Sequence, residues 1–427
     1  MVWQISGKRI RLKQLALFAV MALAMIATAL VVDNPKNQGG RWTVPYFSGA
    51  ANYRIGHGWR YNPADVERFN DLPSLAAQQA HRFEPSPESE LVEFTYSPPG
   101  YLYVAVVARY LFFWQSDLQS VESLQLLTHI GITFWILGRF RNAAGRIVFF
   151  LLYGMNPVVL YCTMTPYYYF WAVIPTAMLC GYLLDKELRF GFWLPLAAAA
   201  AGWAYATRPT CLFVALLFFV YGVLREWKPW GLTAIAVFVV SALLFGGGGF
   251  QQRPWHTMYI GVAAYPNPYM DEFSDNKGYE LFYQKTGKHL TGDRMFDRQL
   301  YDEYSALMKA EFVKIARERP LMLARNAFIN YLLSFSIGYI DGSLKLTYAS
   351  AAAGACFLAL LLWQRKFTFI LATTLCVISM FPYFPPVPAY MFGSYIILVA
   401  AFADIVSDWS ASGRWFSARF DGSGAVL

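Results

Sequence analysis

Long apolar segments recur along this chain, and their recurrence limits the folds open to it more than any other feature. A helix of about 20 apolar residues crosses the hydrocarbon core of a bilayer. Charged residues make up only 15% of the chain, against about 25% in soluble domains. The sequence therefore predicts an all-α polytopic membrane protein. Its twelve apolar segments lie at 15–32, 97–114, 121–138, 146–163, 166–184, 190–206, 209–224, 231–249, 323–340, 346–363, 367–383 and 387–406.

The net charge of +8 fits the same class of protein. Lysines and arginines hold the short loops of membrane proteins in the cytoplasm, so this charge does not indicate a nucleic-acid partner. Four basic residues between positions 8 and 13 precede the first apolar segment, which predicts an uncleaved first helix with its N-terminus inside. The five cysteines lie in or next to apolar segments, so we expect no disulfide framework and no metal site.

The basic loops decide between two topologies. If all twelve segments cross the membrane, the loops 139–146 and 224–231 fall on the outer side, against the preference of basic residues for the cytoplasm. If 97–114 and 323–340 lie in the interface instead, every basic loop becomes cytoplasmic. We therefore expect about 10, and at most 12, transmembrane helices together with interfacial helices.

This topology divides the chain into three parts and places two large polar loops outside. Residues 1–249 form a transmembrane module that includes the outer loop 33–120. Residues 250–322 form the second outer loop. Residues 323–427 supply the C-terminal transmembrane helices and a cytoplasmic tail.

Two acids stand at the edges of the first outer loop. Asp33 directly follows the first span, where it could act as a general base or remain a solvated charge. Glu93 precedes the sequence "TYSPPGY", whose prolines make a rigid turn. This turn could aim Glu93 and Tyr96 into a site, or it could simply begin a helix whose dipole favours a nearby acid.

Arg208 is the most unusual cation of the chain, because it lies in "AYATRPTCLF" between two apolar runs. Its side chain could extend to the interface, where its charge would be solvated. The guanidinium geometry also suits a phosphate ligand, and the predicted topology brings Arg208 to the side of the polar loops. We favour the phosphate.

The stretch 253–279 is the densest mixture of polar and aromatic residues. It predicts a sugar- or headgroup-binding loop, although a plain interfacial loop would use similar residues. "TPYYYFW" at 165–171 could line a lipid groove or lie at the interface. The residues proposed to bind substrate here are Trp255, His256 and Tyr259, with Asp275 as an acid and Tyr390 beside a later proline turn.

The order of these motifs resembles the GT-C superfamily of polyprenyl-phosphate-sugar-dependent glycosyltransferases. It is most similar to the branch that contains protein O-mannosyltransferases and lipid A aminoarabinose transferases. The resemblance covers most of residues 10–280 and rests on "VPYFSGAANYRIGHGW" (44–59), "YSPPGY" and "GWAYATRPTCL". That branch has an aspartate before the aromatic pair of its first-loop helix, where this chain has Val44 and Pro45.

Because the expected aspartate is absent, either the base comes from another position or the activity differs. Asp33 is the first choice, with Glu93 and Asp275 in reserve. The resemblance also implies that Arg208 contacts the carrier phosphate and that His256 and Tyr259 line the site.

The resemblance implies sugar transfer from a polyprenyl-phosphate donor to a glycan, lipid or protein acceptor, with inversion and without a metal or other cofactor. The reaction would take place at the outer face of a bacterial inner membrane, among membrane lipids and without nucleic acid. Two alternatives stay open: a flippase or transporter for a lipid-linked sugar, and a GT-C-like polysaccharide polymerase. The lack of an internal repeat argues against the transporter.

Overall fold

Helices dominate the computed structural model, which describes residues 3–5, 8–10, 12–32, 40–94, 98–226, 228–246, 254–290 and 298–412. Within these residues the strands form two short antiparallel pairs. One pair joins β1 (Trp3–Ile5) to β2 (Lys8–Ile10), and the other joins β3 (Arg60–Tyr61) to β4 (Val92–Glu93). The prediction of an all-α protein is confirmed.

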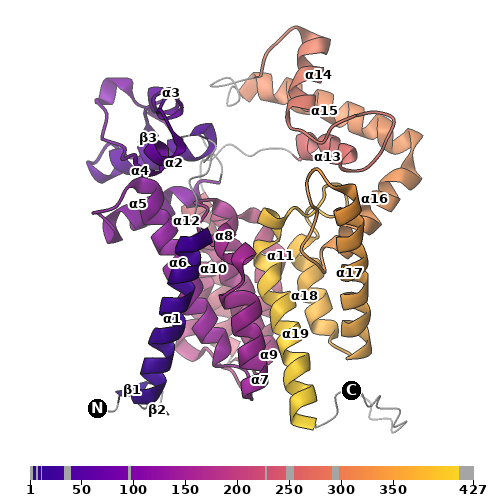
Figure 1. The fold of residues 1–427 in the computed structure, drawn as a ribbon. Coiled ribbons are helices and arrows are strands. Elements are labelled where there is room, and N and C mark those ends of the chain that lie inside the picture. The colour runs from indigo at the N-terminus through magenta and orange to yellow at the C-terminus, as the bar shows by residue number, and fades with distance from the viewer. Residues whose placement is uncertain are drawn as a thin grey trace.

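A bundle of helices forms one half of the molecule, and two polar regions form the other (Figure 1). The main core of buried side chains runs through the bundle and into the first polar region. The bundle contains α1 (Leu12–Val32), α6 (Asp117–Leu137), α7 (Ala143–Phe149), α8 (Pro157–Thr163), α9 (Val173–Leu184), α10 (Leu194–Thr207), α11 (Leu212–Arg225), α12 (Lys228–Gly246), α17 (Leu344–Trp363), α18 (Phe367–Val377) and α19 (Phe392–Ser412).

Four helices are long and apolar enough to cross a membrane: Leu15–Val32, Pro229–Gly246, Leu344–Trp363 and Pro388–Ser412. A fifth candidate is a pair of helices, Ala143–Gly154 and Pro157–Thr163, which are bent by 52° relative to each other. Of the other apolar segments of the described chain, 121–138 lies in the 21-residue helix α6, and the rest form shorter helices. The structure thus shows a helical protein with several possible spans, and the expected number of about ten remains a prediction.

The segment 97–114 enters and leaves at the same end of the bundle, as its predicted interfacial position requires. Just before it, the backbone N–H of Phe94 donates to the carbonyl of Trp59 at 2.8 Å. Near its end, Arg109 donates to the carbonyl of Phe83 at 2.7 Å. Trp59 and Phe83 both belong to the first polar region, so helix α5 (Gly100–Leu111) does not run to the opposite end of the bundle.

The segment 323–340 behaves in the same way. Arg325, in helix α16 (Pro320–Leu333), donates to the carbonyl of Pro266 at 3.3 Å. The Tyr339 hydroxyl, at the end of the segment, donates to the carbonyl of Ala264 at 3.2 Å. Both ends of the segment contact one short loop, so the segment does not run to the opposite end of the bundle. Its position in a membrane interface stays a prediction.

The basic loops gather at one end of the bundle, which we call the basic end. Arg139 pairs with Asp185 at 3.4 Å, and Arg225 donates to the carbonyl of Asp185 at 3.2 Å. Lys366 pairs at 2.6 Å with Asp404 near the end of α19. Strands β1 and β2 and the C-terminal end of α19 lie at the same end (Figure 1). The basic loops, which the sequence predicts to lie on one side of a membrane, thus lie at one end of the bundle.

The two polar regions lie at the opposite end of the bundle (Figure 1). The second one has a hydrophobic core of its own, which includes Phe282, Tyr304 and Met308. The first polar region contains α2 (Gly40–Arg54), α3 (Ala64–Asn70), α4 (Leu75–Ala80), η1 (Glu88–Glu90) and α5, and the second contains α13 (Trp255–Gly261), η6 (Val262–Ala264), α14 (Asn276–Thr286) and α15 (Arg298–Glu318).

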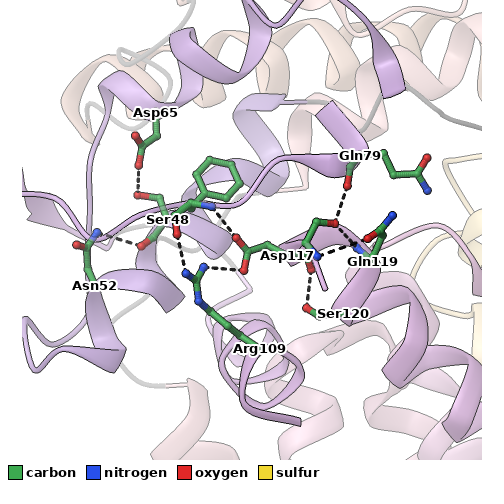
Figure 2. A network of polar contacts seen from close by, with 10 residues as sticks. Ser48, Asn52, Asp65, Gln79, Arg109, Asp117, Gln119 and Ser120 are labelled. Atoms are coloured by element: carbon green, nitrogen blue, oxygen red, sulfur yellow. Dashed lines mark hydrogen bonds and ion pairs between the residues drawn. The ribbon is translucent and has the colours of Figure 1, made fainter. Parts of the chain in front are cut away.

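A buried ion pair fixes the first polar region to the bundle. Arg109 and Asp117 point toward one another in Figure 2, with Nη1 and Oδ1 2.6 Å apart, and their side chains are only 6% and 3% exposed. The second oxygen of Asp117 accepts from the backbone N–H of Phe83 at 2.7 Å, and Arg109 donates to the carbonyl of the same residue. These contacts close a ring that joins the end of α5, the start of α6 and the strand-like segment at Phe83.

Candidate functional site

Arg208 lies at the polar end of the bundle, between the last residue of α10 and the short turn η5 (Pro209–Cys211). Its guanidinium carbon is 4.3 Å from the ring centre of Tyr169, 5.0 Å from that of Tyr390 and 5.8 Å from that of Tyr168. We call these three rings the tyrosine cage. Cation–π attraction to aromatic faces within about 6 Å holds the charge in place.

The hydroxyls of the tyrosine cage form a chain beside the guanidinium. Tyr168 donates to Tyr169 at 3.2 Å, and Tyr169 donates to Tyr390 at 3.4 Å. Among the residues that the structure describes, no carboxylate lies within ion-pair distance of Arg208. The Tyr168 and Tyr169 hydroxyls each use their one proton in this chain, which leaves the Tyr390 hydroxyl as a donor beside the guanidinium. An anion bound by these two groups would be stabilised by charge-assisted hydrogen bonds.

The "PPGY" turn at 98–101 packs against the end of α10 that leads to Arg208. Gly100 begins α5, and a Cβ at this position would lie 2.6 Å from the backbone of Ala206 and Thr207. Trp203 donates from Nε1 to the carbonyl of Gly100 at 3.2 Å. The first turn of α5 therefore packs directly on the last turn of α10, one residue before Arg208. A side chain larger than hydrogen at Gly100 would separate the two helices.

His256 and Asp275 bring the second polar region to this site. His256 Nε2 and Asp275 Oδ1 are 3.3 Å apart, and His256 Nδ1 contacts the hydroxyl of Tyr304. Burial raises the pKa of Tyr304, so this hydroxyl keeps its proton. The side chain of Asp275 is 66% exposed, so this carboxylate is open to solvent.

The turn between α18 and α19 carries Tyr390 and links the cage to the second polar region. Tyr390 lies in η8 (Pro388–Met391), and its ring centre is 5.6 Å from that of Phe384 in the core of that region. Gly261, at the end of α13, packs so closely that a Cβ would lie 2.1 Å from the carbonyl oxygen of Tyr383. The structure therefore brings Arg208 together with Tyr390 and His256 together with Asp275, and the turn that carries Tyr390 packs on the polar region that carries the second pair.

The remaining predicted residues lie elsewhere. Tyr259 is only 7% exposed in the core of the second polar region, where it packs rather than lines the cage. Trp255 packs against the same core, and Lys309 Nζ lies 5.2 Å from its ring centre. Asp33 and Tyr96 lie outside the described residues, so their predicted roles stay predictions.

Glu93 lines a groove at the same polar end of the bundle. It lies in β4, opposite Arg60 of β3, and it is exposed. The groove has a volume of about 620 Å³, and its wall also includes Pro99, the residue before Gly100. The groove and the tyrosine cage therefore flank the same proline–glycine turn.

Tyr168 and Tyr169 were not predicted as site residues. The signal was the tyrosine run at 165–171, which the sequence assigned to a lipid groove or to the interface. Their relation to Arg208 depends on the packing of η3 (Tyr168–Ala172) beside the ends of α10 and α19.

Comparisons with family models, with curated proteins and with solved structures found no match for this chain.

Proposed function

We propose that the protein is an integral membrane glycosyltransferase that moves a sugar from a polyprenyl-phosphate carrier to a glycan, lipid or protein acceptor. The observation that carries the proposal is Arg208 in its tyrosine cage, at the end of an apolar bundle. A polyprenyl phosphate joins one anionic group to a long apolar chain. Such a ligand matches a cation placed where the bundle meets the polar regions.

Arg208 would hold the phosphate while the bond between the sugar and the phosphate breaks. Negative charge grows on the departing phosphate oxygen in that step, and a fixed guanidinium stabilises it. The Tyr390 hydroxyl, which accepts from Tyr169 at the end of the chain of tyrosine hydroxyls, adds a donor beside it. All of these groups are held in place before the substrate binds, which lowers the cost of arranging them during the reaction.

Asp275 would take the proton of the acceptor hydroxyl. That hydroxyl attacks the anomeric carbon, the bond from this carbon to the phosphate oxygen breaks, and the bonding electrons leave with the phosphate. Direct attack inverts the anomeric configuration. His256 contacts one oxygen of Asp275 and is itself in contact with Tyr304, so both positions orient the carboxylate. Glu93 and Asp33 are the alternative bases.

The side of the membrane follows from the charge pattern. The candidate site lies at the end opposite the basic loops, strands β1 and β2 and the C-terminal end of α19 (Figure 1). Because basic loops stay in the cytoplasm, this site would face the periplasm or the exterior of a bacterial inner membrane.

A transfer assay tests the proposal. The purified protein, reconstituted in lipid nanodiscs, would be mixed with a labelled polyprenyl-phosphate sugar and a cell-envelope glycan extract. Arg208→Gln should abolish both transfer and donor binding. Arg225→Gln is the matched control, because Arg225 also lies over two tyrosine rings, Tyr182 at 5.4 Å and Tyr221 at 4.8 Å, but at the basic end.

The same assay identifies the base. Asp275→Asn should lower the turnover rate by about 10²–10⁴-fold with little change in donor affinity, as expected for a lost general base. At saturating acceptor, Glu93→Gln and Asp33→Asn should retain most of the turnover rate; a loss of that saturated rate in either one alone would move the role of base to that residue. Wild-type protein that translocates the lipid-linked sugar in liposomes but never transfers it would establish the flippase instead.

A further inference from the structure

The groove beside Glu93 has the size and lining of a small-molecule site. Its volume of about 620 Å³ lies within the roughly 300–1,000 Å³ usual for ligand pockets. Its wall combines the loop before β3, strand β4, the first turns of α5 and the end of α12. Because these elements are far apart in sequence, the groove exists only in the folded protein.

A continuous row of aromatic rings runs along this groove. Trp59 stacks on Tyr53 with ring centres 4.2 Å apart and an angle of 21° between the planes. Trp59 also contacts Tyr103 at 4.5 Å, and Tyr103 meets Phe245 at 4.8 Å. Trp59, Tyr103 and Phe245 all line the groove. The negative faces of such rings attract weakly positive C–H groups, which a sugar ring presents on its flat side.

The polar lining complements the edge of a sugar rather than an anion. Arg60 pairs with Glu88 at 2.7 Å, and both side chains remain 40% and 70% exposed. Glu93 adds a second carboxylate, so among the described residues that line the groove two acids and one arginine give one excess negative charge. Phosphates and nucleotides would be repelled by this charge. Hydroxyl groups can donate to the carboxylates and accept from the guanidinium.

We propose that this groove binds the saccharide chain of the acceptor, so that the acceptor is an extended neutral glycan. This inference rests on the proposed glycosyltransferase function and names its acceptor class. The groove reaches Pro99 and Leu102, which flank Gly100 on the turn packed against the residues just before Arg208. A glycan lying on the aromatic row would thus have one end directed toward the carrier phosphate, and Glu93 would bind a sugar hydroxyl without taking its proton.

Binding without a donor tests the inference separately from transfer. The full protein in nanodiscs would be titrated with linear neutral gluco- and manno-oligosaccharides, from disaccharides to hexasaccharides, and followed by tryptophan fluorescence and calorimetry. Wild-type protein should bind at least one series, with affinity rising with length. Tyr103→Ala and Glu93→Gln should each weaken binding about tenfold or more, that is by about 1.4 kcal/mol.

Tyr283→Ala is the control for loss of an exposed aromatic side chain, because Tyr283 stacks on His289 at 4.0 Å in the second polar region. Its saccharide affinity should equal that of the wild type. Glu93 is exposed, so Glu93→Gln should fold like the wild type. If Tyr103→Ala is unstable, Glu93→Gln still tests saccharide binding by the groove.

The outcomes separate the two proposals. The wild-type protein could bind saccharides, and both groove variants could weaken that binding, while no sugar is transferred. This result supports the saccharide site in the groove and refutes the glycosyltransferase function. Transfer to a lipid or peptide acceptor without saccharide binding supports the transferase and overturns the groove. Binding that neither groove variant changes also overturns it.

Discussion

The buried pair of Arg109 and Asp117 gives the sharpest prediction on stability. Asp117→Asn keeps the size of the side chain and an oxygen that can accept from the N–H of Phe83, but it removes the negative charge. Arg109 would then keep a positive charge in a site where its side chain is only 6% exposed. Removing one partner of a buried ion pair typically costs about 3–5 kcal/mol, so we expect a loss in this range.

A second pair in the same polar region isolates the effect of burial. Arg60 and Glu88 approach to 2.7 Å, almost the 2.6 Å of the buried pair, but they are 40% and 70% exposed. Glu88→Gln should therefore cost less than about 1 kcal/mol. The double variant Arg109→Met/Asp117→Leu should cost less than the sum of its single changes, because no unpaired charge remains.

Thermal unfolding in detergent, followed by intrinsic fluorescence, measures these differences, and limited proteolysis locates them. Cleavage should appear first between residues 81 and 117, where the ring of contacts holds α5 and α6 to the first polar region. Equal small shifts for Asp117→Asn and Glu88→Gln would refute the reasoning, because burial would then make no difference to the pair.

Three further predictions concern packing and pH. Gly100→Ala should cost about 1–3 kcal/mol through overpacking and reduce transfer in the nanodisc assay, whereas Gly131→Ala, whose Cβ would meet nothing within 4 Å, should leave both unchanged. Gly261→Ala should loosen the second polar region from Tyr383, seen as faster proteolysis of 254–318 with the bundle intact; unchanged proteolysis would contradict the close contact. Burial lowers the pKa of His81 below its ordinary 6.5, with Asp117, Asp65 and Glu84 opposing, so the folded state favours the neutral ring. The contribution of His81 to the free energy of unfolding should therefore be fully present above pH 6.5 and be lost as the pH falls below it. In melting measured against pH, His81→Phe should reduce this dependence.

The sequence predicted the sorting of the loops because charge acts on each loop separately. Basic residues at 139–146 and 224–231 were enough to single out two segments that each contact a polar region at both ends, while their interfacial position in a membrane stays a prediction. The tyrosine cage could not be found in this way, since the hydroxyls of Tyr169 and Tyr390 meet across 221 positions of sequence. The ion pair of Arg109 was also missed, because the arginine lies inside a segment that reads as uniformly apolar.

The proline–glycine turn before α5 has a role in the structure that the sequence did not predict. The sequence offered two interpretations, a turn that aims Glu93 and Tyr96, or an ordinary helix start. The structure adds a third role, because Gly100 lets α5 pack against the backbone that carries Arg208. Gly100 makes this contact without a side chain. No polar or charged residue therefore marks the contact in the sequence.

A comparison of two arginines explains why Arg208 is the stronger functional candidate. Arg225 also lies over tyrosine rings, but its Nη1 donates to the carbonyls of Tyr182 and Asp185 at 2.6 and 3.2 Å. Its donors thus stabilise the fold at the basic end. Within the described chain the rings hold Arg208 without an ion-pair partner. A carboxylate partner would compete with an incoming phosphate, whereas aromatic faces fix the guanidinium and leave its N–H groups available. Aromatic faces without an ion-paired carboxylate therefore leave the guanidinium of Arg208 available to the proposed phosphate, whereas backbone carbonyls occupy that of Arg225.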